Sequence, residues 1–324
     1  MHNMRKATLQ RAWMPLLLVS IATCAPASDT SDSASRAALA AQAEVETGTI
    51  VSGPFRLRYH TEGTGKPAIV IGSAVYLPRG FSQNIRKHLQ MVFLDHRGYA
   101  PSPGPMDATE FATAKLLDDV ERARQQLELG RIVIIGHSIH SVIALEYAKK
   151  YPENVSHVVM IGSAALNAGN EKVMAQYWEE LASPERKAAV LENRRRLPDD
   201  ELDRLPSGQR FLRAYIREGP RIWYDPHFDE SPLFEGVEYN DDYARVQPLG
   251  RVNILDGLDT FDRPVLLALG RYDFLVAPPS SWEAIRPRFK DLTVKIFDQS
   301  GHWPHYEEAA SFDAALSEWI EERQ

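Results

Sequence analysis

The chain has 324 residues, of which 44% are hydrophobic and 25% are charged, as in an ordinary soluble globular protein. Its formal net charge of -7 argues against a nucleic-acid-binding surface, which would require a basic stripe. No apolar run reaches the roughly 20 residues that a membrane span needs. The only cysteine, Cys24, leaves no intrachain disulfide, so the fold must be held by its core alone.

The N-terminal residues have the order of an export signal. Basic residues up to Arg11 precede an apolar stretch from Ala12 to Ala22, and small residues follow. We therefore predict an export signal over 1–24, and a flexible tether over 25–43, which is rich in Ser, Ala, Asp and Thr. The segment ending at Cys24 resembles a bacterial lipobox, which would make Cys24 a lipidated membrane tether. Ordinary cleavage after Ala27 is the alternative, so the protein is expected to be periplasmic or lipid-anchored to a bacterial membrane.

From about residue 44 onward, short β-branched runs alternate with helical patterns, which is typical of an α/β fold with a mostly parallel sheet. The predicted strands are Thr49–Val51, Phe55–His60, Ala68–Ile71, Met91–Leu94, Ile132–Ile135, His157–Ile161, Val265–Leu269 and Thr293–Phe297. The predicted helices of this part are Phe81–His88, Glu110–Leu127, Ser138–Tyr151, Ser280–Ile285 and Ala309–Glu322. The first two strands are expected to form an antiparallel hairpin.

The alternation is interrupted once, between residues 166 and 262. This stretch shows no strand pattern and is rich in helix formers, aromatic residues and charge. We predict that it is a helical insertion, and that residues 44–165 and 263–324 form the core domain around it.

One pentapeptide, Gly136-His137-Ser138-Ile139-His140, lies between a predicted strand and a predicted helix. A strand that turns sharply through a serine into a helix resembles the nucleophile elbow of the α/β-hydrolases, in which the turn exposes the hydroxyl above the sheet. The helix N-terminus at this turn favours developing negative charge. That family normally has glycine at the last position, where this chain has His140.

This resemblance implies an eight-stranded, mostly parallel α/β-hydrolase sheet with a helical lid inserted after the sixth strand. The alternative for the insertion is a helical subdomain that takes no part in substrate binding. The resemblance also implies that an acid and a histidine follow the serine in that order.

Suitable partners for Ser138 follow two later strands. A serine hydroxyl needs a base to become a nucleophile, and the base needs a group that fixes its tautomer. Asp273 follows a buried strand by three residues, although a carboxylate there can also be a simple turn residue. His302 follows the last strand after Gly301, and its only nearby rival is His305. We predict the catalytic residues Ser138, Asp273 and His302.

The oxyanion hole is less clearly marked in the sequence. One donor is expected to be the backbone N–H of Ile139, directly after the nucleophile. The second donor should come from the loop after the third strand, and the sequence leaves Ser73 and Ala74 as alternatives. The family often has His-Gly followed by a small residue and Pro-Gly there, and this chain lacks that His and that Pro-Gly.

Four motifs together resemble the proline-iminopeptidase-like branch of the α/β-hydrolases, from about Thr49 to the C-terminus. They are Asp95-His96-Arg97-Gly98, Gly136-His137-Ser138, Gly270-Arg271-Tyr272-Asp273 and Ser300-Gly301-His302. True proline iminopeptidases usually have Trp-Gly after the serine. This chain has Ile139-His140 instead, which bears on its peptidase specificity.

Substrate contacts are expected from His140, Tyr76, Trp223 and Tyr224. His140 either packs as a hydrogen-bonded core residue or shapes the acyl pocket. The acidic residues of the insertion, Asp225, Asp229, Glu230, Glu235, Glu238, Asp241 and Asp242, either form a solvated face or bind a substrate amine, as the resembled branch does with lid carboxylates. His137-x-x-His140 lacks the i,i+4 spacing of a zinc helix, so we predict no metal and no cofactor.

The leading functional hypothesis is a serine hydrolase that cleaves a small ester or amide through an acyl-enzyme intermediate. The first alternative is a proline-iminopeptidase-type aminopeptidase that recognises a free N-terminal amine. The second is a non-catalytic protein that uses the same fold to bind a ligand. The expected partner is a small-molecule or short-peptide substrate, and not a nucleic acid.

Overall fold

The computed structural model describes residues 45–101, 103–165, 170–276 and 278–323. The predicted export signal, the tether and Cys24 lie outside these described residues. Among the helices that the structure describes, none is both long and apolar enough to cross a membrane.

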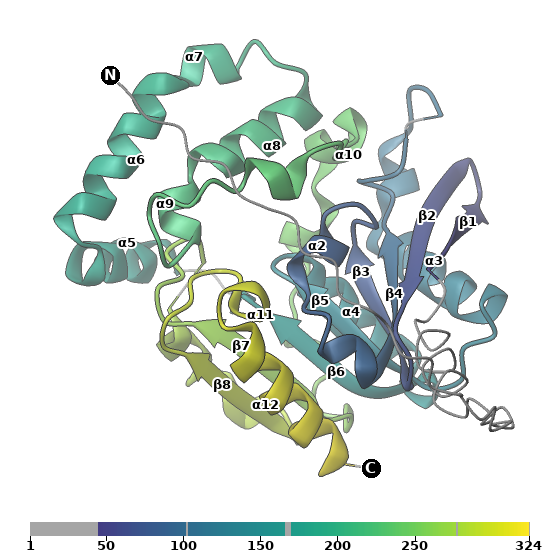
Figure 1. Ribbon diagram of the computed structural model, residues 1–324. Helices are drawn as coiled ribbons and strands as arrows, with labels where there is room; N and C mark the ends of the chain where they lie inside the picture. The colour runs from purple at the N-terminus through teal and green to yellow at the C-terminus, as the bar shows by residue number, and fades with distance from the viewer. Residues whose placement is uncertain (1–44, 102, 166–169, 277, 324) are drawn as a thin grey trace, which may run out of the picture. The chain divides into compact units, whose positions relative to one another are not determined.

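All eight predicted strands are confirmed, and they form one sheet (Figure 1). They are β1 (Glu46–Ser52), β2 (Phe55–Glu62), β3 (Lys66–Gly72), β4 (Leu89–Asp95), β5 (Ile132–His137), β6 (Val155–Ile161), β7 (Val265–Gly270) and β8 (Leu292–Phe297). Their order across the sheet is β1-β2-β4-β3-β5-β6-β7-β8. As expected, β1 and β2 are antiparallel; β2 also runs antiparallel to β4, and the remaining pairs are parallel.

Helices cover both faces of the sheet, because successive residues of each central strand point to opposite sides. In β5, Ile132 and Ile134 belong to the core on one face, with α3 (Thr113–Gln126) and α4 (His140–Lys150). Val133 and Ile135 belong to the core on the other face, with α12 (Ala309–Glu321). Strands buried on both sides must be apolar throughout, which is why they read as continuous β-branched runs.

Three of the predicted core helices match α3, α4 and α12 closely, and the other two predictions are wrong. In place of a helix over 81–88 the chain forms α2 (Leu77–Gly80) and a single turn, η1 (Ile85–Lys87). The Ser82 hydroxyl accepts hydrogen bonds from the backbone N–H groups of Asn84 and Ile85, which competes with helix formation. In place of a helix over 280–285 there is only the turn η6 (Pro279–Trp282), between prolines that restrict their neighbours.

Every element that the structure describes between β6 and β7 is helical. These elements are α5 (Asn170–Leu181), α6 (Pro184–Arg196), α7 (Asp199–Leu202), α8 (Ser207–Arg217), α9 (Gly219–Ile222), η4 (Ser231–Phe234), α10 (Asp241–Val246) and η5 (Pro248–Arg251). Local capping explains some of their boundaries: the Ser183 hydroxyl accepts from the N–H of Arg186 at the start of α6. We call residues 166–262 the insertion. The remaining short elements of the core are η2 (Ala108–Phe111), η3 (Pro152–Asn154), η7 (Arg286–Arg288) and α11 (Pro304–Glu307).

Candidate active site

Ser138 lies at a strained turn between β5 and α4. Its φ of 57° is in the left-handed region, which a serine rarely adopts. The turn is held by the Ser138 N–H, which donates to the carbonyl of Ile161 at 2.7 Å. A side chain at Gly136 would place its Cβ 2.4 Å from the carbonyl oxygen of His140, so this position requires glycine. Such backbone strain at a partly buried serine is characteristic of functional sites.

Asp273 and His302 form a buried pair at the carboxyl ends of β7 and β8. The Nδ1 of His302 lies 2.6 Å from Oδ2 of Asp273. The other oxygen of Asp273 accepts from the backbone N–H groups of Leu275 and Val276 at 3.0 and 3.2 Å. The carboxylate is therefore fixed, and it can orient the imidazole with Nε2 free for a proton. That Nε2 has no hydrogen-bond partner within the described ranges.

The histidines around this pair have different roles. The ring of His137, the residue before Ser138, packs 4.7 Å from that of His302, and its Nε2 lies 3.0 Å from the His302 carbonyl oxygen. His305 is fully buried and stacks on Trp303, with ring centroids 5.2 Å apart. Burial lowers the pKa of His305 to about 3, so its ring is neutral. Asp273 thus pairs with His302 and not with the rival His305.

The contacts of the loop after β3 distinguish the two candidates for the second oxyanion donor, Ser73 and Ala74. The N–H of Ala74 donates to Oδ1 of Asp95 at 2.7 Å and is therefore occupied. Asp95 is held in turn by Arg58, whose Nε lies 2.5 Å from its Oδ2. Burial raises the pKa of Asp95 to about 6, against the opposing effect of Arg58. Ser73 is fully buried, and Ile139 follows Ser138 at the N-terminal end of α4.

His140, which replaces the family's glycine, is accommodated beside Gly72. A Cβ at Gly72 would lie 2.7 Å from Cδ1 of Leu77 and 3.1 Å from Nδ1 of His140, so the bare glycine provides the space for the ring. The His140 ring packs against that of His96 with ring centroids 4.8 Å apart and an interplanar angle of 48°. Its Nδ1 is buried without a hydrogen-bond partner in the part of the chain described here. Burial lowers the pKa of His140 to about 4, which leaves it neutral.

A cavity of about 40 Å³ lies beside Ser138 and is mostly aromatic. The structure brings Tyr76 and His140 to it, as the sequence predicts. The other lining residues are Tyr99, His137, Ser138, Ile139, Phe211, Leu212, Tyr215, Phe234, Tyr239 and Trp303. Five of these belong to the insertion. Phe234 and Tyr239 are not among the predicted substrate contacts, because no pattern in the sequence distinguishes them from other aromatic residues of the insertion.

Trp223 and Tyr224 are not among the residues that line this cavity. Trp223 is buried and stacks on Trp303, with ring centroids 5.4 Å apart at an interplanar angle of 20°. Tyr224 is 42% exposed, and its backbone N–H donates to Glu307. Both residues contact the core from the insertion, and neither lines the cavity.

The acidic stretch of the insertion is divided by burial. Asp225, Asp229, Glu235, Glu238 and Asp241 are exposed, as in an ordinary solvated face. Glu230 is only 2% exposed, and its Oε2 accepts from Nε1 of Trp223 at 2.8 Å. Burial raises the pKa of Glu230 to about 8. This carboxyl group is therefore mostly neutral at pH 7.

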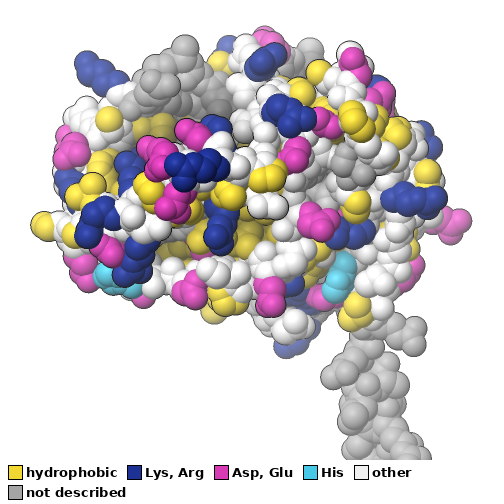
Figure 2. Space-filling view, turned by 90° about the horizontal axis from the view of Figure 1, so that it is seen from above, with side chains coloured by type: hydrophobic (Ala, Val, Ile, Leu, Met, Phe, Trp, Pro, Cys, Tyr) yellow, Lys and Arg dark blue, Asp and Glu magenta, His cyan; other side chains and the backbone are white. Residues whose placement is uncertain are grey.

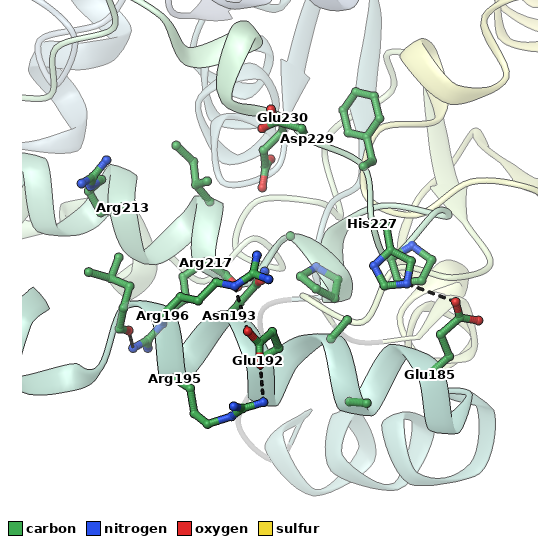
Figure 3. A pocket seen from close by; sticks show the side chains of 18 residues that line it. Glu185, Glu192, Asn193, Arg195, Arg196, Arg213, Arg217, His227, Asp229 and Glu230 are labelled. Carbon is green, nitrogen blue, oxygen red and sulfur yellow. Dashed lines mark hydrogen bonds and ion pairs between the residues drawn. The ribbon is translucent and has the colours of Figure 1, made fainter.

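A larger cavity of about 700 Å³ lies within the insertion, between α6, α8, α9 and the segment after α9. Figure 2 looks onto this side of the molecule and shows charged side chains of both signs around a hollow. Figure 3 shows arginines such as Arg213 and Arg217 from the helices, facing Asp229 and Glu230 across the cavity. Ser138, Asp273 and His302 are not among its lining residues.

The motif Asp95-His96-Arg97-Gly98 has a structural role. Arg97 is buried, and its Nε donates to Oδ2 of Asp119 at 2.6 Å. The same guanidinium lies over the ring of Phe55, 4.7 Å from its centroid. No group of histidine, cysteine and acidic side chains suited to a metal ion was found among the residues that the structure describes.

A serine at a strained turn between a strand and a helix of a doubly covered parallel sheet, with an Asp–His pair at the ends of two later strands, is the arrangement that the α/β-hydrolases have. The family profile described as alpha/beta hydrolase fold matches residues 70–309. The chain is 37% identical over 272 residues to the AB hydrolase superfamily protein YclE of Bacillus subtilis (strain 168), over 83% of this chain and 96% of that protein.

Two further comparisons involve proline iminopeptidases. The enzyme of Heyndrickxia coagulans is 24% identical over 280 residues, with 81% of this chain and 93% of that protein covered. The solved structure of the Mycobacterium smegmatis enzyme superposes with a TM-score of 0.64 at 16% identity, over 86% of this chain and 98% of that one. The chain belongs to the α/β-hydrolase family, with relatives in its proline-iminopeptidase branch, and it is a hydrolase.

Proposed function

We propose that this hydrolase cleaves a small ester or amide through a Ser138–His302–Asp273 triad and an acyl-enzyme intermediate. The observation that carries the proposal is the 2.6 Å contact between His302 Nδ1 and Asp273 Oδ2, together with the packing of the His302 ring against His137, the residue before the strained Ser138. The free Nε2 of His302 is the nitrogen that a general base would use. Catalytic hydrogen bonds often tighten only when substrate is bound, so an unmade bond to Ser138 is compatible with this role.

In the proposed reaction, Oγ of Ser138 attacks the substrate carbonyl carbon while Nε2 of His302 takes the hydroxyl proton. His302 then gives this proton to the leaving alcohol or amine as the carbonyl re-forms. Asp273 orients the imidazole and stabilises its charged form. Water attacks the acyl-enzyme with His302 again as base. The bond between the acyl carbon and Oγ of Ser138 then breaks, His302 returns the proton to Oγ, and the acid is released. Because the Ala74 N–H is occupied, we assign the oxyanion hole to the N–H groups of Ile139 and Ser73.

The size of the cavity favours a short acyl group. A volume of about 40 Å³ is well below the roughly 150 Å³ of an engineered apolar cavity that binds benzene. Its aromatic walls favour apolar atoms. His140, whose buried Nδ1 has no hydrogen-bond partner among the described residues, is one of the residues that line it. We propose that His140 shapes this acyl site and that the helices of the insertion act as its lid.

An aminopeptidase is the second candidate, because Glu230 has a buried oxygen with no hydrogen-bond partner among the described residues. The proline iminopeptidases among the relatives add to this possibility. Against it, a neutral carboxyl group attracts an ammonium ion weakly, and the pKa of Glu230 is raised to about 8. Parallel assays on p-nitrophenyl acetate and on proline p-nitroanilide distinguish the two candidates. Turnover of the anilide alone, and only with a free α-amine, would reject the esterase.

The decisive experiment compares wild type with Ser138→Ala. We expect the variant to keep its circular dichroism spectrum and to lose both ester hydrolysis and labelling by a fluorophosphonate. Turnover at the wild-type rate would refute the nucleophile assignment. A folded wild-type protein that neither turns over esters nor reacts with the fluorophosphonate would favour a ligand-binding protein.

A further inference from the structure

One short segment of the insertion contacts both loops that carry the candidate acid and base. We call Gly219–Tyr224 the docking segment. The N–H of His302 donates to the carbonyl of Ile222 at 2.6 Å, and the N–H of Phe274 donates to the carbonyl of Arg221 at 2.9 Å. The position of the catalytic histidine therefore depends on how the insertion docks against the core.

Glu307, at the end of α11, bridges the docking segment and the loop of His302. Its Oε1 accepts from the N–H of Tyr224 at 2.6 Å, and its Oε2 accepts from the N–H of Gly301 at 2.8 Å. The two backbones meet closely at this place, because a Cβ on Gly301 would lie 2.0 Å from the carbonyl oxygen of Ile222. Each oxygen of the Glu307 carboxylate thus accepts one backbone N–H, one from the docking segment and one from the His302 loop.

The charged groups around Glu307 come from three sides. Asp273 and Glu230 are acidic neighbours from the core and from the insertion. Arg186 of α6 is a basic neighbour, and its guanidinium donates to the carbonyls of Pro220, Trp223 and Tyr224. Burial raises the pKa of Glu307 to about 7, with Asp273 adding to the effect, although three backbone N–H groups oppose it.

We propose that Glu307 is a positioning residue of the hydrolase reaction: its ionised carboxylate joins the docking segment to the His302 loop and so holds His302 in its reactive place. A carboxylate offers an acceptor oxygen to each N–H group. A carboxylic acid or a carboxamide offers only one good acceptor oxygen, so one of the two N–H groups loses its bond and the bridge between the docking segment and the His302 loop is broken. This role rests on the proposed function, because it acts through His302.

The test measures kcat and KM for p-nitrophenyl acetate from pH 5.5 to 8.5 in wild type and Glu307→Gln. The matched control is Glu318→Gln, on the exposed side of α12. We expect Glu307→Gln to lower kcat at pH 8.5 by about 10- to 100-fold, the range that small misplacements of a catalytic group produce, with KM within about threefold. The ratio of wild type to Glu307→Gln should fall toward one at pH 5.5, because protonated Glu307 then behaves as the carboxamide does.

A merely structural contribution would give a ratio that does not change with pH, and that result would overturn the proposal. Glu307→Asp keeps the ionisable group and should restore part of the pH dependence. Should Glu307→Gln fail to fold, wild type alone decides. The rate at which a fluorophosphonate labels the wild type must then fall below pH 7 more steeply than the protonation of His302 alone would produce. A pH dependence that fits the binding of a single proton would reject the positioning role.

The outcome can be separated from that of the triad itself. Activity in Ser138→Ala would defeat the proposed function, whatever the Glu307 variants do. An inactive Ser138→Ala together with a Glu307→Gln that matches wild type at every pH would leave the triad in place and overturn only the positioning role.

Discussion

Replacing Glu230 by glutamine should make the protein's stability less dependent on pH. In the folded protein the Glu230 carboxyl group is buried, and its pKa is raised from 4.5 to about 8. The folded state therefore keeps a proton that the unfolded state releases, and the stability of the wild type falls as the pH rises from about 4.5 to 8. Glutamine can still accept from Nε1 of Trp223, and it carries no proton to lose.

The size of the effect follows from the shift. One pH unit corresponds to 1.36 kcal/mol, so a shift of this size is worth roughly 3–5 kcal/mol when fully expressed. Glu230→Gln should unfold at nearly the wild-type urea concentration at pH 5. At pH 8.5 the free energy of unfolding of Glu230→Gln should exceed that of the wild type by roughly 3–5 kcal/mol.

Urea unfolding followed by circular dichroism at pH 5, 6, 7, 8 and 8.5 measures this difference. Glu238→Gln is the control, because Glu238 belongs to the same acidic stretch and is exposed. The free energy of unfolding of Glu238→Gln should change with pH in the same way as that of the wild type. If the Glu230→Gln curve were also parallel from pH 5 to 8.5, the buried and neutral state of Glu230 would be refuted.

Two further predictions concern the Asp–His pair and the buried arginine of the core. Asp273→Asn should keep the fold and lower kcat by about 10⁴, because the amide no longer favours the tautomer of His302 that presents a free Nε2. Steady-state kinetics measure this loss of kcat. A loss below tenfold would contradict the prediction. Arg97→Ala should lower the free energy of unfolding by about 3–5 kcal/mol, because it leaves Asp119 buried without its partner. The exposed Arg195→Ala is its control, with an expected change within about 0.5 kcal/mol in urea unfolding.

The strands were the most predictable part of the fold. A strand such as β5, buried on both faces, has to be apolar along its whole length, and that requirement is visible in the sequence. The two failed helix predictions lie where local contacts compete with the helix. The hydroxyl of Ser82 accepts hydrogen bonds from the backbone N–H groups of Asn84 and Ile85. Prolines border the segment around Ser280.

The triad could be proposed from the sequence because its members follow strand ends in a set order. The preceding Gly301 favoured His302 over His305, which lies three residues further along the chain. In the structure one pairs with Asp273 and the other is stacked on Trp303. The second oxyanion donor was undecided, because the Ala74 N–H is engaged by Asp95, which comes from a different strand.

The sequence by itself determined the class of fold, the helical insertion and the candidate nucleophile, because periodicity and strand–turn–helix patterns are local properties of the chain. Only the tertiary structure decided which residues of the insertion line the cavity beside Ser138. It also decided that Glu230 is the one deeply buried residue of the acidic stretch, and that Glu307 joins two segments distant in the sequence. The physical reason is that burial and proximity depend on how elements dock. A short polar motif looks the same in the sequence whether its side chains meet water, a backbone N–H or an aromatic ring.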